Sequence, residues 1–113
     1  MVIMLDNYKI PDRGHVEFNV SFDIAVTAEE AQKKVRWWLR DNVSMFADAD
    51  TPTLVVGQQT VWRVPAYFAL SRARFNNIGA VNVDAITGEL LDLDNAKTSI
   101  LEYLEKEVKP RMP

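Results

Sequence analysis

The sequence contains no cysteine and only one histidine, His15. Without cysteine the chain can form no disulfide bond, no thiolate nucleophile and no cysteine-based zinc site. One histidine cannot build a multi-histidine metal site, and no G-x-S-x-G motif places a serine nucleophile for it. Walker and G-x-G-x-x-G loops are absent from the sequence as well. We therefore expect no catalytic residues, no cofactor and no metal, and we predict that the chain is not an enzyme.

Basic charge and long apolar runs are also scarce. The 13 Lys and Arg residues against 16 Asp and Glu residues give a net charge of −3, whereas nucleic-acid binders normally carry a basic excess. No apolar stretch approaches the roughly 18 residues that a membrane helix needs. The first nine residues, M-V-I-M-L-D-N-Y-K, lack the features of a signal peptide. We expect a cytoplasmic protein that binds neither nucleic acid nor membrane.

The bulk composition is that of an ordinary folded domain. The chain has 113 residues, of which 48% are hydrophobic and 26% are charged. This length corresponds to one domain, and the composition excludes intrinsic disorder. We therefore expect residues 1–113 to form a single domain.

An unbroken alternation of polar and apolar residues covers residues 15–26, H-V-E-F-N-V-S-F-D-I-A-V. Successive side chains of a β-strand point to opposite faces of the sheet, so this pattern predicts a long strand with one buried face. The six apolar side chains on that face are Val16, Phe18, Val20, Phe22, Ile24 and Val26.

Thr27 and Glu30 have the spacing of a capping box, which predicts the start of a helix running from about Ala28 to about Val43. On its outer face, Glu29–Lys33 and Glu30–Lys34 are spaced for i, i+4 ion pairs. The apolar stripe at helical spacing consists of Ala28, Ala31, Val35, Trp38, Leu39 and Val43.

Downstream of this helix the sequence predicts two loops, four strands and a last helix. The loops are expected at 47–53 and 71–79, the strands at 54–57, 60–70, 81–84 and about 90–93, and the C-terminal helix at about 95–109. Pro65 cannot donate a backbone hydrogen bond, so its strand should be irregular or at a sheet edge there. We expect Asp94 or Asn95 to cap the last helix and Pro110 to end it. Its inward-facing residues should be Ile100, Leu101, Leu104 and Val108.

Residues 81–91, V-N-V-D-A-I-T-G-E-L-L, place two short apolar runs on either side of A-I-T-G. Gly88 suits a positive φ at the end of a type I turn, which predicts a hairpin with a bulge. Asp84 can accept hydrogen bonds from backbone N–H groups of that turn. We therefore assign Asp84, Thr87 and Gly88 a structural role in the turn.

Two stretches together resemble the core signature of PepSY domains: W-R-V at 62–64 and G-A-V-N-V-D-A-I-T-G-E-L at 79–90. In that family an aromatic-x-V strand precedes a V-D-a-x-T-G hairpin. The helix that begins T-A-E-E-A-Q-K-K-V is similar to the helix that opens the family pattern, so the resemblance covers roughly residues 27–91. It implies a small α+β fold and a family linked to protease inhibition and to extracellular or envelope roles.

These observations predict an α+β fold of the cystatin-like kind. An antiparallel sheet of four or five strands should curl around the 28–43 helix, and the C-terminal helix should cover an edge or part of the same face. In the strand at 60–70, Trp62, Val64 and Phe68 share one face, while Val61 and Tyr67 share the other.

Trp37 is the unusual residue of the first helix, because it lies about 100° around the helix from Trp38 and outside the apolar stripe. Lys33, Lys34 and Arg40 are its neighbours at i−4, i−3 and i+3. An exposed Trp beside cations is typical of a protein–protein hot spot, and it can also stack on a nucleobase. The alternative is that the N-terminal arm or the last helix covers Trp37.

A second candidate site lies in the loop predicted at 71–79. It consists of Arg72, Arg74, Phe75, Asn76 and Asn77, and arginines with amides can hold an anion or a peptide carboxylate. The alternative is a solvated loop with Phe75 turned inward.

The leading hypothesis for function is a non-enzymatic protein-interaction or regulatory module that self-associates as a homodimer. It requires an exposed apolar patch that includes Trp37. The alternative is a small-molecule-binding protein or enzyme with a pocket between the curled sheet and the helix. That alternative requires a concave apolar cavity with convergent polar groups such as Tyr67, Arg63 and Asn82.

Overall fold

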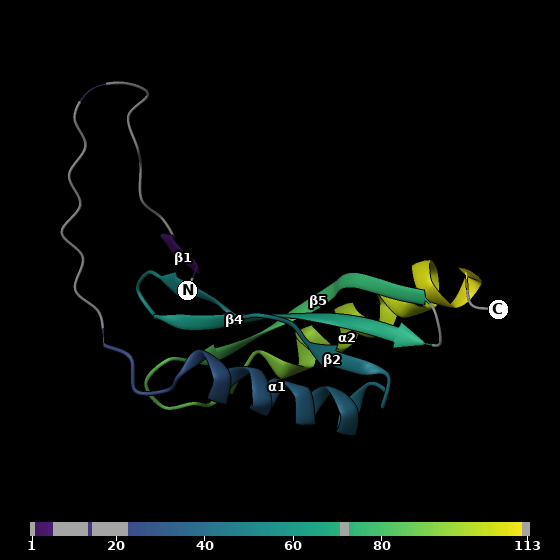
Figure 1. The fold of residues 1–113 in the computed structure, drawn as a ribbon, viewed down its shortest axis with the longest axis horizontal. Helices are drawn as coiled ribbons and strands as arrows, with labels where there is room; N and C mark the ends of the chain where they lie inside the picture. Colours follow the sequence, from purple (N-terminus) through teal and green to yellow (C-terminus); the bar gives the residue numbers. More distant parts are fainter. Residues whose placement is uncertain (1, 6–13, 15–22, 71–72, 112–113) are drawn as a thin grey trace.

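A computed structural model describes residues 2–5, 14, 23–70 and 73–111 of the chain. Figure 1 shows α1 running along one side of a twisted sheet, with α2 behind β5. The elements are β1 Val2–Leu5, α1 Ala28–Asn42, β2 Ala47–Ala49, β3 Thr53–Val56, β4 Val61–Leu70, β5 Ala73–Asp84, β6 Leu90–Leu91, α2 Leu93–Tyr103, the π-helical η1 Leu104–Val108 and the 3₁₀-helical η2 Lys109–Arg111.

The described strands form one mixed sheet with the order β1-β3-β4-β5-β6, and β2 pairs with β4 beside β3. The α+β class is confirmed, but a wholly antiparallel sheet of four or five strands is wrong. Six strands take part, and β1 pairs with β3 in parallel. Parallel neighbours need a long crossover connection, and α1 lies in the sequence between these two strands.

The strand predicted at 15–26 falls largely on residues 15–22, which lie outside the described residues. Its last four residues, 23–26, are not strand. The backbone N–H groups of Ala25 and Val26 instead both donate to the carbonyl of Ala85, at 2.8 and 2.9 Å. The carbonyl of Val26 accepts a 2.7 Å hydrogen bond from Nε1 of the buried Trp62. The chain is therefore attached to the sheet immediately before α1 begins.

The start of α1 is confirmed by its cap. The backbone N–H of Glu30 donates to Oγ1 of Thr27 at 3.1 Å, and the Glu30 carboxylate accepts from the Thr27 N–H at 3.3 Å. The buried residues of the helix are Ala31, Val35 and Leu39, as its apolar stripe predicts. The i, i+4 ion pairs predicted for Glu29–Lys33 and Glu30–Lys34 are not among the ion pairs of the described residues. The second pair does not form because the Glu30 carboxylate caps the helix and Lys34 bonds to the Gly88 carbonyl.

The core lies on one face of β4. Trp62, Val64, Ala66 and Phe68 alternate along the strand and are all buried, and both helices contribute buried residues to the same cluster. On the other face of β4, Arg63, Pro65 and Tyr67 are half-buried, whereas Val61 is buried. Both helices therefore pack on one side of the sheet, and the sheet is covered by helix on that side alone within the described residues.

Pro65 lies at the point where β4 changes its neighbour. Residues 61–63 pair with β3 and residues 66–68 pair with β2. The Pro65 carbonyl accepts from the N–H of Asp50 at 2.8 Å, so the Pro65 nitrogen also faces that side, between the two short strands. A residue without an N–H is tolerated there because no ladder hydrogen bond is lost.

Both segments predicted to be loops, 47–53 and 71–79, contain strand, so these two loop predictions are wrong. Residues 47–49 form β2 against Phe68, Tyr67 and Ala66, and most of 71–79 belongs to β5. In the β4–β5 ladder, the five residues of β5 from Phe75 to Gly79 oppose the three residues of β4 from Ala66 to Phe68. Asn77 takes a φ of 56°, which lets β5 hold the two extra residues in a bulge, and regular pairing continues on either side with the register shifted. A bulge of polar residues removes the apolar alternation that identifies a strand.

The hairpin predicted at 81–91 is confirmed, with a four-residue turn after Asp84. Gly88 has a φ of 79°, as predicted. The ladder pairs Asn82 with Leu91 and Val83 with Leu90 without a register shift, so the predicted bulge is absent from this hairpin. The N–H of Gly88 donates to the carbonyl of Asp84, which closes the turn.

The C-terminal helix begins earlier than predicted. Its N-cap is Asp92, with a φ of 53°, rather than Asp94 or Asn95. The α-helix ends at Tyr103, and helical turns continue through η1 and η2 past Pro110. Pro110 lies in the first turn of η2, a position where proline is tolerated because its missing N–H costs no hydrogen bond of that helix. Ile100 and Val108 are buried and Leu104 packs on the core, but Leu101 is exposed.

At Gly79, β5 and α2 approach each other closely. A Cβ atom added to Gly79 would overlap Cγ1 of the buried Ile100. We predict that Gly79→Ala lowers the free energy of unfolding by about 1–3 kcal/mol, because a β-branched side chain in a packed core cannot easily move aside. Urea denaturation followed by circular dichroism measures the change.

A double-mutant cycle gives the control. Ile100→Ala removes Cγ1 and should itself cost about 2–5 kcal/mol, but in that background the added methyl of Gly79→Ala meets open space. The cost of Gly79→Ala should therefore fall to near zero or reverse sign. An equal cost in both backgrounds would mean that the close approach is not the cause.

Candidate functional site

The outer face of α1 carries an exposed aromatic side chain. Trp37 is 55% exposed, and the Arg40 guanidinium carbon lies 5.7 Å from the centroid of its ring. Lys33 and Asp41 flank it one turn before and one turn after, and both are exposed. We call these four residues the Trp37 surface. The last helix does not cover Trp37, because α2 packs along β5. The other alternative, the N-terminal arm, lies largely outside the described residues.

Lys34 does not belong to this surface, although the sequence placed it there. Its Nζ donates a 2.9 Å hydrogen bond to the carbonyl of Gly88, in the turn after β5. Lys34 lies on the flank of α1 that faces the hairpin, so its ammonium group reaches a carbonyl that the turn leaves free. The contact joins the middle of α1 to a turn 54 residues away in the sequence.

Arg40 is held in place by Asp48 of the edge strand β2. Arg40 Nη2 lies 3.3 Å from Asp48 Oδ2, and Arg36 Nε donates to Asp48 Oδ1 at 2.7 Å. The Tyr67 hydroxyl is 3.3 Å from Asp48 Oδ2, and the backbone N–H of Ala49 donates to Oδ1 at 2.7 Å. Asp48 is therefore the acceptor that connects α1, β2 and β4.

These contacts favour the ionised form of Asp48. Burial raises the pKa of this carboxyl, but the hydrogen bonds from Arg36 and Ala49 and the charges of Arg36 and Arg40 outweigh burial, so the pKa is lowered. Sequence reasoning assigned Asp48 to a loop and missed this role. The signals that could have found it are the alternation A-D-A at 47–49 and two arginines spaced i, i+4 on one flank of the helix.

The described part of the candidate ligand group, residues 74–77, is not a loop, and Arg74 is already paired. Arg74 lies in β5, with its guanidinium carbon 3.9 Å from the Tyr67 ring centroid. It donates to Asn76 Oδ1 at 2.7 Å and reaches Asp50 Oδ2 at 3.5 Å. Because Asp50 compensates the charge of Arg74, this group is a poor site for an anion.

The other members of that group have separate positions. Phe75 is half-buried against Phe68, with ring centroids 6.4 Å apart, which agrees with the inward-turned alternative. Asn76 and Asn77 lie in the bulge of β5 and are exposed. Arg72 lies outside the described residues.

Asp84, Thr87 and Gly88 have the structural role predicted for them. Asp84 Oδ1 accepts from the backbone N–H groups of Ile86 at 2.8 Å and Thr87 at 3.0 Å, and Gln59 Nε2 donates to Asp84 Oδ2 at 2.8 Å. The hydrogen bond from the Thr87 N–H, with those from Gln59 and Ile86, lowers the pKa of Asp84. Its carboxylate is used to close the turn.

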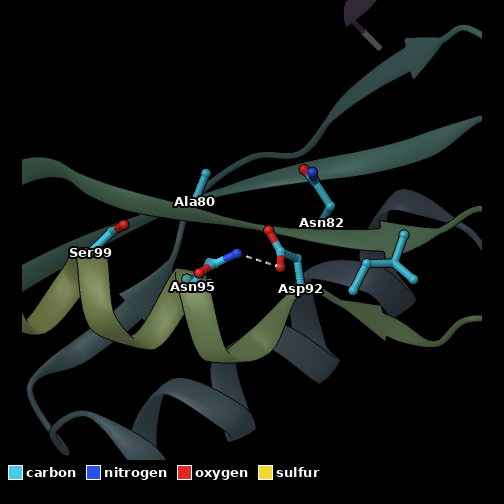
Figure 2. Close-up of a pocket in the computed structure, with 7 residues that line it drawn as sticks. Ala80, Asn82, Asp92, Asn95 and Ser99 are labelled. Carbon is cyan, nitrogen blue, oxygen red and sulfur yellow. Dashed lines mark hydrogen bonds between the residues drawn. The ribbon is translucent and has the colours of Figure 1, made fainter.

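Two shallow depressions adjoin around Asn82 of β5, and they share Asn82, Leu91 and Asp92. One, of about 270 Å³, runs between β5 and the first turns of α2 (Figure 2). There Asn95 Nδ2 donates to Asp92 Oδ1 at 2.8 Å. The other, of about 360 Å³, reaches Arg63. Both are open rather than enclosed, unlike a typical ligand pocket.

Asn82 carries the one buried side-chain polar atom that lacks a hydrogen-bond partner among the described residues. Its Oδ1 is buried and accepts no hydrogen bond. Arg63 and Asn82 therefore converge as the pocket hypothesis required, but Tyr67 does not, because Arg74 covers its ring. The space between α1 and the sheet is filled by fully buried side chains such as Leu39 and Val64, so the predicted location of the pocket is wrong.

The described residues contain no group of three or more His, Cys, Asp or Glu side chains placed to hold a metal ion. No helix in that part of the chain is long and apolar enough to cross a membrane. Comparisons with protein-family models, with curated proteins and with solved structures find no match for the chain, so the resemblance to PepSY domains stays a prediction.

The Asp48 contacts predict a pH-dependent stability. Asp48→Asn should lower the free energy of unfolding by about 1 kcal/mol at pH 7, since it weakens partly buried ionic hydrogen bonds. Because the folded-state pKa of Asp48 is lowered, its contribution is complete above the unfolded-state pKa of about 4. It is lost as pH falls through the folded-state value. Urea denaturation of both proteins between pH 7 and pH 2 should show the difference shrinking on acidification.

Asp50→Asn is the matched control, because Asp50 is also an acid near an arginine. Asp50 is more exposed than Asp48, and its ion pair with Arg74 is longer, at 3.5 Å. Its effect at pH 7 should be the smaller of the two. Equal effects, or a wild-type advantage over Asp48→Asn that persists at the lowest pH, would contradict the role given to Asp48.

Proposed function

We propose that this chain is a non-enzymatic protein-interaction module, with the Trp37 surface as its binding surface and a second copy of the chain as its partner. The proposal includes a cytoplasmic location and the PepSY-like relationship of residues 27–91. It assigns no catalytic or cofactor-binding residue.

One observation carries the proposal: Trp37 is 55% exposed on a helix whose other aromatic residue, Trp38, packs against the core. A large aromatic side chain loses about 1.5–3 kcal/mol of favourable transfer free energy when it stays in water. Trp is also the residue type most enriched at interface hot spots. An interaction that buries Trp37 recovers this free energy, whereas the fold itself does not need the indole ring.

The surroundings of Trp37 suit an interface as well. Asp48 holds Arg40 beside the indole ring through the ion pair with Nη2. A side chain already held in one position loses less conformational entropy when a partner binds. Trp and Arg are both residue types that are enriched at the centres of interface hot spots.

Trp37→Ala tests the surface directly. In sedimentation velocity over a series from micromolar to millimolar protein, the wild-type chain should show a concentration-dependent shift from monomer to dimer. Trp37→Ala should stay monomeric throughout, since the hot-spot contact is lost, typically at 2 kcal/mol or more. Its circular dichroism and thermal midpoint should match the wild type, because Trp37 contributes little to the core.

Ile86→Ala is the control. Ile86 is a similarly exposed apolar residue, at 49%, but it lies in the β5–β6 turn. This variant should dimerise like the wild type. A wild-type chain that stays monomeric at every concentration, or a Trp37→Ala variant that dimerises normally, would refute the proposal.

A second function, small-molecule binding, is favoured by the unpaired Oδ1 of Asn82 beside Arg63. A buried acceptor without a partner costs about 1–3 kcal/mol, and a ligand with an N–H or O–H donor would satisfy it. The test is to titrate the protein with a library of small polar compounds and to follow its backbone-amide NMR signals. This function predicts that a binding compound shifts the signals of residues around Asn82 and Leu91 selectively. Shifts that are absent, or scattered over the whole surface, would count against it.

A further inference from the structure

We infer that two copies of the chain meet through α1 about a two-fold axis at Trp37, with Lys33 of each copy paired to Asp41 of the other. This inference rests on the proposed function and names the partner and the geometry of its surface. It follows from the order of the side chains on the outer face of the helix.

Lys33, Trp37 and Asp41 form one row on the surface of α1. They are spaced four residues apart, so they lie about 6 Å apart along the helix axis and about 40° apart around it. Rows at this spacing form the ridges that pack into the grooves of a neighbouring helix, at a crossing angle of about −50°. The row ends one turn either side of the exposed indole ring, and all three residues are helical and described.

The charges at the two ends of this row are opposite. A two-fold axis at Trp37 reverses the row of the second copy, so each Lys33 comes beside the Asp41 of the other copy. A surface that meets itself must be self-complementary about its axis. Opposite charges at equal distances on either side of an apolar centre satisfy this requirement, whereas a parallel arrangement would place like charges together.

The remaining cations near Trp37 do not oppose this pairing. Lys34 and Arg40 lie on opposite flanks of the row, about 60° to either side of Trp37. Lys34 is bonded to the Gly88 carbonyl, and Arg40 is paired with Asp48. By contrast, within the described residues Lys33 and Asp41 make no hydrogen bond or ion pair.

The size of the row limits the affinity. One helix face buries less than the roughly 1,200–2,000 Å² of a standard stable interface, so we expect a reversible dimer with a dissociation constant in the micromolar range or weaker. The two exposed ion pairs should make association weaker at high salt, because salt screens charges at a surface.

Charge reversal with mixing is the experiment that tests this geometry. Lys33→Glu places two acids opposite each other at both ends of a symmetric pair, and Asp41→Lys places two lysines there. Each variant alone should therefore be monomeric at concentrations where the wild type is dimeric. In an equimolar mixture both ends become oppositely charged again, so sedimentation velocity should show a heterodimer close to wild-type affinity.

The outcomes separate this inference from the proposed function. Charge-reversal variants that each dimerise like the wild type, or a mixture that stays monomeric, would overturn the two-fold pairing. In that case, loss of the dimer in Trp37→Ala would still support the Trp37 surface as the binding surface. A wild-type monomer would overturn both. Circular dichroism on each variant checks that α1 is intact.

Cysteine cross-linking gives a second measurement, which reports which positions face each other in the dimer. The chain has no cysteine of its own, so Lys33→Cys and Asp41→Cys each introduce one thiol. Under mild oxidation the mixed variants should form a covalent dimer faster than either variant alone, because positions 33 and 41 face each other. Faster cross-linking of either variant with itself would overturn the inferred geometry.

Discussion

The row of apolar side chains along one face of β4 is the constraint on which the rest of the structure depends. Trp62, Val64, Ala66 and Phe68 are buried in succession, and β4 pairs with β2, β3 and β5. Burying each large side chain contributes about 1.5–3 kcal/mol, so the row decides which face both helices cover. The bulge in β5 preserves this arrangement, because two extra residues return Phe75 to the same face as Phe68.

The direction in which α1 faces follows from contacts at its start and along its two flanks. Trp62 Nε1 holds the Val26 carbonyl immediately before the capping box, Lys34 binds the hairpin carbonyl on one flank, and Asp48 binds two arginines on the other. Helix stability comes mainly from packing of the apolar stripe. With the stripe and both flanks engaged, only the outer row with Trp37 is left for a partner.

Much of the local structure could be predicted from the sequence, because it depends on neighbours in the chain. The capping box at Thr27, the extent of α1, the positive φ of Gly88 and the hydrogen bonds that Asp84 accepts from the N–H groups of Ile86 and Thr87 all involve residues within five positions of each other. The strands β2 and the first half of β5 were missed. In β2 the residues are alanine and aspartate, held in strand by β4 partners about 20 positions away, and in β5 the polar Asn76 and Asn77 of the bulge interrupt the alternation.

The sequence by itself determined the fold class, the two faces of α1, the turn after β5 and the position of Trp37 away from the core stripe, because helical and strand periodicity act within a few residues. Only the tertiary structure decided the rest. It separated Lys34 from Trp37, joined Arg40 to Asp48, paired Arg74 with Asp50 and left Lys33 and Asp41 without partners among the described residues. Long polar side chains bond to whichever group packing brings within reach, and that choice has no signature in sequence spacing.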